Sequence, residues 1–303
     1  MQKNRLPGVL LILIAVLAWG GQAPVSKLAL DHVDAYFLAL ARCVLALPVF
    51  VVLLAWREGI GAFSYERGLP AASLYGFLGF TGFGLLFFIG VTHSLPEHAV
   101  IILSLQPALA ALWQWIVQRR RPPAFTLACI ALCVAGLMLV VTKGDVAATQ
   151  DGGTWFGDVL LLGAALCWMG YTAGVARFAH WSALRYTTLS ALPAAAVLVV
   201  VTALAWLAGE TRIPGMAAVS AVAPHLAFLV IVTALVAGLA WNAGVRQIGA
   251  LNALLLGNLV PVVTFAVRIA QGHHFLPVEF IGAGLVVFSL VANNIYIRQY
   301  VKD

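Results

Sequence analysis

Long apolar runs separated by short polar breaks follow one another along the whole chain. A helix needs about 20 mostly apolar residues to cross the hydrocarbon core of a bilayer, which is roughly 30 Å thick. The runs have this length, and no polar break is long enough to hold a soluble domain. We therefore predict an all-α membrane protein with ten spans, at residues 8–30, 35–56, 70–92, 97–117, 123–142, 157–178, 185–208, 222–245, 251–270 and 278–297.

One stretch of the sequence is repeated. Residues 17–30 read LAWGGQAPVSKLAL and residues 166–179 read LCWMGYTAGVARFA, about half a chain apart, with Trp168 in the place of Trp19. Shorter echoes follow in the same order, such as Gly90-Val91 with Gly244-Val245. Collinear echoes at a nearly constant offset indicate a duplication.

The number of spans in each copy decides how the copies are arranged. Five is odd, so the second copy must enter the membrane from the opposite side, and substrate sites of such inverted repeats lie between the halves near the midplane. We therefore predict two inverted five-helix repeats around a central cavity. Their boundaries are 1–146 and 157–303, with a linker at 147–156.

Composition and charge agree with a lipid environment. Hydrophobic residues make up 63% of the chain, charged residues only 9%, and the mean hydropathy is +1.00. The pI of about 9.4 does not indicate nucleic-acid binding, because the basic residues are scattered between apolar runs. With the N-terminus inside, most of the 17 Lys and Arg residues fall on the cytoplasmic side. We expect a multi-pass protein of the bacterial inner membrane with both termini in the cytoplasm.

The cysteines indicate neither a metal site nor a disulfide framework. All four lie inside apolar runs without zinc-type spacing, and buried free thiols usually pack as small hydrophobic groups. We expect no metal, no cofactor and no catalytic residues. The expected partners are a small-molecule substrate and lipid; the oligomeric state is left open, and a monomer is compatible with the sequence. The cysteines are Cys43, Cys129, Cys133 and Cys167.

Polar side chains that lipid would not tolerate mark the candidate substrate site. Any one of them can simply join helices by a hydrogen bond, worth about 0.6–2 kcal/mol in membranes. As a group they fall in the spans expected around a central cavity, together with aromatic residues deeper than the usual interfacial belt. The candidate substrate-binding residues are Trp19, Gln22, Phe83, Ser104, Gln106, Trp168, Tyr171, Trp241, Asn242, Asn252 and Asn258.

Two prolines and one arginine within spans need separate interpretation. Pro107 and Pro261 occupy equivalent places in the two halves, where each removes a backbone hydrogen bond, so they are candidate hinges as well as packing kinks. Arg42 lies about two turns into its span. It can bind a substrate carboxylate, or pair with helix-end carbonyls or with Asp31 or Asp34; the structural role is the expectation.

The chain resembles a known superfamily on these residues. Trp19-Gly20 and Lys27 in the first span, Arg42 in the second, and two proline-containing spans each followed by a proline-led span resemble the drug/metabolite transporter superfamily, in its ten-helix EamA-type branch. Within that branch the general similarity is to bacterial exporters of aromatic amino acids.

The resemblance also has departures. A Gly-Glu pair often follows the fourth and ninth helices in that branch. This sequence has Gln118-Arg119-Arg120 and Gly272-His273-His274 there, so no role of that glutamate is transferred.

The resemblance and the polar residues together predict a secondary transporter, not an enzyme. The expected activity is export of small metabolites, aromatic or neutral amino acids, by alternating access. A multidrug exporter of cationic compounds is the alternative, and an intramembrane enzyme or a channel would be a different class. No Asp or Glu lies in the middle of a span, which favours facilitated movement or exchange over a carboxylate proton relay.

Overall fold

The computed structural model describes residues 6–106, 108, 109, 112, 115, 116, 119, 121–145 and 154–300, and no strand occurs among them. In chain order its elements are α1 (Leu6–Gly20), α2 (Gln22–Leu30), α3 (Ala35–Glu58), the 3-10 turn η1 (Ile60–Phe63), α4 (Leu69–Gly76), η2 (Phe77–Gly82), α5 (Phe83–Thr92), α6 (Pro96–Ser104), α8 (Ala124–Thr142), α9 (Trp155–Arg177), α10 (Ala183–Leu207), α11 (Met216–Ala227), η4 (Phe228–Val236), α12 (Ala237–Ile248), α13 (Ala250–Gly257), α14 (Val260–Ala270) and α15 (Pro277–Tyr300).

The all-α membrane class is confirmed. Eight helical segments of the described chain are long and apolar enough to cross a membrane, and α14 is a shorter apolar helix. Continuous passages such as α1–α2, α4–η2–α5 and α11–η4–α12 account for several of them. The protein is therefore a multi-pass membrane protein.

Two of the expected spans are interrupted. In the span predicted at 97–117, α6 ends at Ser104 and a turn follows at Leu105. In the span predicted at 251–270, a turn at Asn258 and Leu259 separates α13 from α14. Pro261 is therefore near the start of α14, a position where proline's missing N–H removes no helical bond. Pro107 lies outside the described residues.

Irregular helix also occurs at corresponding places in the third and eighth expected spans. The segments η2 and η4 are both π-helical. Short π segments inside α-helices occur frequently at functional sites. Both segments lie beside the cavity described below, so the helix distortion is located where a ligand would bind.

Side-chain caps begin the second and seventh expected spans. Asp34 accepts a hydrogen bond from the Phe37 backbone N–H at 2.8 Å, and Ser182 accepts one from the Arg185 N–H at 2.9 Å. Each cap satisfies a backbone donor that a helix start leaves free. The helices that they begin, α3 and α10, pack against each other.

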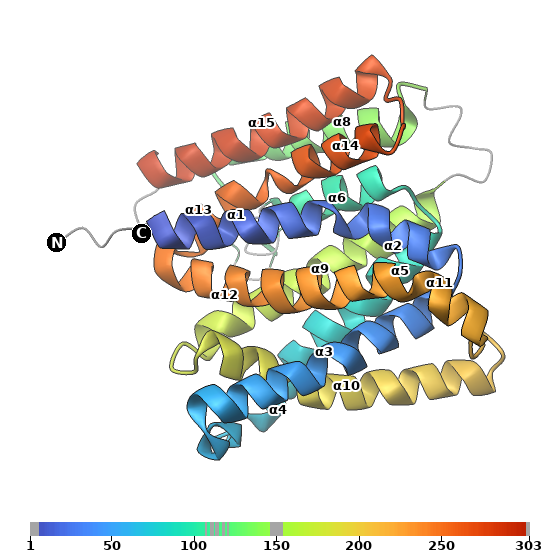
Figure 1. Ribbon diagram of the computed structural model, residues 1–303. Coiled ribbons are helices and arrows are strands. Elements are labelled where there is room, and N and C mark those ends of the chain that lie inside the picture. The colour runs from blue at the N-terminus through green and yellow to red at the C-terminus, as the bar shows by residue number, and fades with distance from the viewer. Residues whose placement is uncertain are drawn as a thin grey trace.

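The closest packing joins segments before residue 146 to segments after residue 154. In this way α8 packs on α15, α1 on α12, α5 on α9, and α6 on α14. Figure 1 shows α8 and α15 side by side at the top, and the start of α1 and the end of α15 at the same end of the molecule. The two halves of the chain therefore form one intertwined bundle.

Glycines set the distance between the most extensively paired helices. A Cβ added at Gly136 of α8 would lie 2.6 Å from the Gly282 carbonyl oxygen, and one added at Gly282 would lie 2.6 Å from the Gly136 oxygen. Any side chain there would push the backbones apart. In lipid, where association depends on such close packing, small residues permit it.

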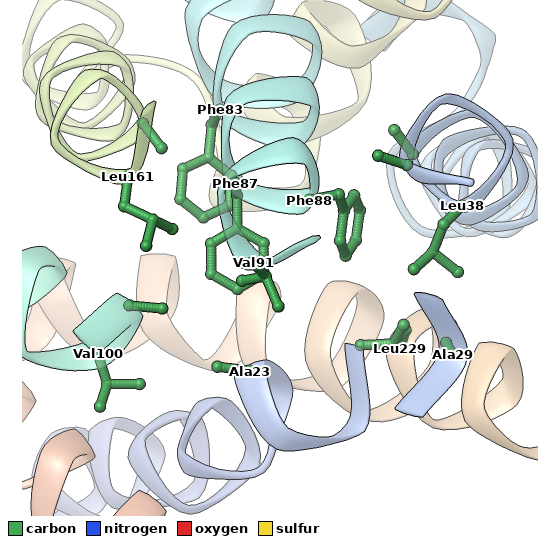
Figure 2. Close-up of a cluster of buried hydrophobic side chains, with 14 of the residues drawn as sticks. Ala23, Ala29, Leu38, Phe83, Phe87, Phe88, Val91, Val100, Leu161 and Leu229 are labelled. Carbon is green, nitrogen blue, oxygen red and sulfur yellow. The ribbon is translucent and has the colours of Figure 1, made fainter. Parts of the chain in front are cut away.

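The core lies around α5. Figure 2 shows Phe83, Phe87 and Phe88 projecting from this helix between neighbours that include Leu161 of α9 and Leu38 of α3. Phe88 and Leu38 are fully buried. Helix α5 thus stands in the middle of the bundle, and its aromatic side chains reach both the packed core and the cavity.

A central aromatic and amide cavity

A cavity of about 160 Å³ lies in the middle of the bundle. A cavity needs about 10–15 Å³ to hold one water molecule, so this one has room for on the order of ten. Its walls come from both halves of the chain: from α1, α2, α3, η2, α5 and α6 in the first half, and from α9, α10, η4, α12, α13 and α14 in the second. The sequence-predicted central cavity is thus present as a structural feature.

Ten of the eleven predicted substrate-binding residues line this cavity: Trp19, Gln22, Phe83, Ser104, Gln106, Trp168, Tyr171, Trp241, Asn242 and Asn258. Asn252 is not part of the lining, and its side-chain amide donates to the Ile248 carbonyl one turn earlier in the chain. The structure therefore brings residues of six predicted spans to one place and leaves Asn252 outside it.

The repeated tryptophans meet at the centre. The ring centroids of Trp19 and Trp168 are 5.6 Å apart at 86°, and those of Trp19 and Trp241 are 5.1 Å apart at 51°. Phe83 lies 5.1 Å from Trp168. These centroid distances lie in the range of favourable aromatic contacts, and the Trp19–Trp168 pair has the favoured edge-to-face geometry, so the rings pack against one another while lining the cavity.

One hydrogen bond explains the orientation of Trp19. Its indole Nε1 donates to the Thr233 carbonyl at 3.1 Å. Thr233 belongs to the π-helical segment η4, so a backbone oxygen of the distorted helix is used by a side chain from the first helix. The Trp19 ring is thereby fixed between the two halves.

The amide groups occupy two different environments. Asn242 donates from Nδ2 to the Thr187 hydroxyl at 2.9 Å, which joins α12 to α10. Asn258, in the break between α13 and α14, is 3% exposed and its Nδ2 has no partner among the described residues. A buried donor without a partner is costly, so Asn258 has a hydrogen bond available for a ligand in the cavity.

Sequence reasoning missed several wall residues. Thr187 and Thr233 line the cavity, but threonine inside a helix commonly bonds its own backbone, and nothing in the sequence separates these two from others. The motif Ala46-Leu47-Pro48 of α3 is repeated as Ala191-Leu192-Pro193 of α10. This echo was a usable signal, since Ala46 and Ala191 both face the cavity.

Arg42 also lines the cavity and makes none of the expected pairs. Among the described residues it has neither an ion pair with Asp31 or Asp34 nor a hydrogen bond to a carbonyl. Asp34 is used differently, because its carboxylate caps α3 and accepts from the Thr211 hydroxyl. The expected structural pairing of Arg42 is therefore wrong for the described part of the chain.

A second polar group lies at the start of α6. The buried Glu97 carboxylate accepts from Arg268 of α14 at 3.3 Å, and its other oxygen lies 3.5 Å from Nε2 of His273. Ligand atoms of Glu97, His273 and Glu279 lie within 4.8 Å of one another, close enough for a metal site.

The hydrogen-bond directions in this group favour a network over a metal ion. Arg268 approaches Nδ1 of His273 at 3.2 Å, and a guanidinium can only donate. Nδ1 must therefore accept, so in the neutral ring the proton is on Nε2, which lies 3.5 Å from a Glu97 oxygen. A nitrogen that carries a proton offers no lone pair to a metal.

Lys27 and Arg185 anchor opposite ends of the bundle. The Lys27 ammonium donates to the carbonyls of Val91, Thr92 and Ser94 at 2.8–2.9 Å, where α5 ends, as a cation favours a helix C-terminus. Arg185 contacts Glu66 at 2.6 Å. The hydrogen bond from Arg185 lowers the pKa of Glu66, so the exposed Glu66 carboxylate stays ionised at neutral pH.

A multi-pass helical bundle with a small cavity between its halves is the architecture of a membrane carrier. The profile of the EamA-like transporter family matches residues 6–142 and 155–295. The chain belongs to this family, and it is therefore a membrane transporter.

Individual relatives agree with this assignment. The uncharacterized transporter YrdR of Bacillus subtilis (strain 168) is 29% identical over 304 residues, covering 99% of this chain and 95% of the relative. YyaM from the same organism, also an uncharacterized transporter, is 28% identical over 84% of this chain and 82% of its own. A solved crystal structure at 20% identity has a TM-score of 0.67 and covers 98% of this chain and 100% of its own, which shows a shared fold.

Proposed function

We propose that this transporter exports small, partly apolar metabolites, of which aromatic or other neutral amino acids are the main class. The observation that carries the proposal is the composition of the cavity, where the Trp19, Trp168 and Trp241 rings stand beside the Asn242 and Asn258 amides. Rings provide stacking surface for a planar side chain. The amides provide donors and acceptors for the polar end of the same molecule.

Alternating access is the mechanism that fits this arrangement. We infer two inverted repeats, 1–146 and 157–303, with a linker at 147–156, which rock about the cavity. The most extensive helix pairs join the halves, and the pairings α1 with α12 and α5 with α9 exchange when the halves are interchanged. The helix breaks at Leu105 and at Asn258-Leu259 support this, because interrupted helices commonly surround transport sites.

Orientation and compartment belong to the same proposal. The distribution of Lys and Arg favours a cytoplasmic location of both termini, and the start of α1 and the end of α15 lie at one end of the molecule (Figure 1). In a bacterial inner membrane this orientation gives the cavity access to cytoplasmic metabolites in one state. Pro107 and Pro261 remain candidate hinges, each next to one of the two helix breaks.

The proposal is tested by counterflow in proteoliposomes loaded with phenylalanine, tyrosine or tryptophan. We expect saturable exchange of labelled substrate. Trp168→Ala removes a central ring and should lower apparent affinity at least about tenfold, since ring contacts and buried area are both lost. Trp206→Ala is the matched control, because Trp206 is 52% exposed on the bundle surface and should leave exchange unchanged.

The outcomes separate the other classes. Flux that does not saturate would indicate a channel, and appearance of a chemically changed product would indicate an enzyme. Exchange of cationic drugs in place of amino acids would favour the multidrug alternative, for which the aromatic walls supply cation–π surfaces. Equal losses of apparent affinity in Trp168→Ala and Trp206→Ala would show that the cavity is not the substrate site.

A further inference from the structure

We propose that Arg42 binds the carboxylate of the transported molecule and makes the cavity select carboxylate-bearing substrates over purely cationic ones. The proposal rests on the transport function above and names the chemical class that the cavity accepts. Among the described residues that line the cavity, Arg42 is the one with a charged side chain.

The position of Arg42 is fixed by the helix that carries it. Leu38 and Arg42 are four residues apart on α3 and therefore share a face. Leu38 is fully buried against the core, and Figure 2 shows Phe88 of α5 projecting toward it. Arg42 is accordingly directed into the bundle and not toward lipid.

The guanidinium is held by contacts that leave its donors free. It lies 4.9 Å from the centroid of the Phe88 ring, and a Cβ added at Gly84 would lie 3.4 Å from Nη2. A ring face and a glycine backbone position the group without using its N–H groups. No hydrogen bond or ion pair to another described residue involves them.

The carboxylates on neighbouring elements are engaged elsewhere. Asp34 caps α3 and accepts from Thr211, and Glu97 of α6 pairs with Arg268. Asp158 of α9 accepts from Ser94 and Thr154. Among the described residues Arg42 thus has no counterion, and an unpaired cation inside a membrane protein is unfavourable unless a water-filled cavity or an anion accommodates it.

The chemistry of the guanidinium selects the ligand. Its planar fork of donors matches a carboxylate by two parallel charge-assisted hydrogen bonds. A ligand with its carboxylate on Arg42 can place a ring among Phe83, Trp19 and Trp168, which line the same cavity. A ligand that carries only a positive charge would be repelled by Arg42, with no lining carboxylate among the described residues to compensate.

The experiment compares four probes that share one aromatic ring. Phenylalanine carries a carboxylate and an ammonium group, 3-phenylpropionate only the carboxylate, and phenylalaninamide and phenethylamine only the cation. Each is used as a competitor of counterflow and as a stabiliser of the purified wild-type protein against heat. We expect the two carboxylates to compete and stabilise at least tenfold more effectively than the two cations.

The variants are Arg42→Gln and Arg42→Lys, with Arg57→Gln as the matched control on the same helix. Arg57 is exposed and stacks on exposed Trp56, so its loss should leave the ranking unchanged. Arg42→Gln should lose the preference for carboxylates, and Arg42→Lys should retain part of it, because a point charge replaces the bidentate fork. The proposal would be overturned if wild type and Arg42→Gln ranked the four probes in the same order.

Failure of the proposed function gives a different result. If wild-type protein exchanges none of the probes, amino-acid transport is wrong, while selective heat stabilisation by 3-phenylpropionate that is lost in Arg42→Gln still supports the carboxylate site. Absence of that stabilisation in wild type overturns the site as well. The wild-type ranking needs no variant, so the carboxylate preference is tested even where Arg42→Gln fails to fold.

Discussion

At the scale of single residues, side chains of one type differ in whether they line the cavity. Three asparagines stood as equivalent candidates in the sequence. Asn242 and Asn258 line the cavity, whereas Asn252 bonds its own helix. A sequence shows that an amide lies in an apolar run, but only the rotation of the helix decides whether the amide reaches the cavity or a backbone carbonyl.

The asparagines allow a matched comparison. Asn242→Ala removes a group that lines the cavity, so it should weaken substrate affinity up to about tenfold, the value of one net hydrogen bond. Asn252→Ala should leave affinity unchanged, because its amide is not in the lining. Saturation curves of counterflow provide the measurement. An equal effect of both substitutions would mean that amides act on the fold and not on the ligand.

At the scale of elements, the helices meet through groups from distant parts of the chain. Glu97 at the start of α6 is fully buried, and Arg268 of α14 supplies its cation. The sequence did not indicate that these two residues pair, because both lie near span ends, where charges are ordinary. Their partnership depends on how the ends of α6 and α14 come together.

The Glu97–Arg268 pair should contribute more to the free energy of unfolding than charges near span ends usually do. Arg268→Met leaves a buried carboxylate without its ion-pair partner, which should lower the unfolding free energy by on the order of 3 kcal/mol. Glu97→Gln combined with Arg268→Met removes both charges and should recover most of the loss. Thermal melting in detergent measures both.

Arg212→Met serves as the control for that comparison, because Arg212 is exposed. A double variant that melts below Arg268→Met alone would show that the two residues act independently. A melting point unchanged by Arg268→Met would show that water or another group already compensates Glu97.

At the scale of the whole molecule, the proposed topology places the two ends of the bundle on opposite sides of the membrane. Gly61 follows α3 and Glu210 follows α10, and both are exposed. With the N-terminus inside, a cysteine at Gly61 should react with an impermeant maleimide only after the cells are opened. A cysteine at Glu210 should react in intact cells.

The native cysteines are removed for this measurement, although Cys43, Cys129 and Cys133 are buried and Cys167 is half-buried. Labelling of Gly61→Cys and Glu210→Cys from the same side would contradict the proposed topology. It would also contradict the inverted arrangement of the repeats, since the two loops follow corresponding spans in the two halves.

The sequence by itself determined the class of this protein and most of the aromatic and amide residues that line its cavity. Apolar runs of membrane-spanning length leave helices as the available structure, because backbone groups have no water to bond in lipid. The repeated Trp19 and Trp168 located the central region, since polar and aromatic residues deep in a span must face protein or water. Both conclusions depend on local composition and are therefore readable along the chain.

Only the tertiary structure decided which partners those residues have. It ended α6 at Ser104, separated α13 from α14, and directed the Thr233 carbonyl to Trp19. It also left Arg42 without the carboxylates that lie nearest to it along the chain. A helical period reports which residues share a face, but the rotation, depth and ends of each helix are set by contacts between segments far apart in the sequence.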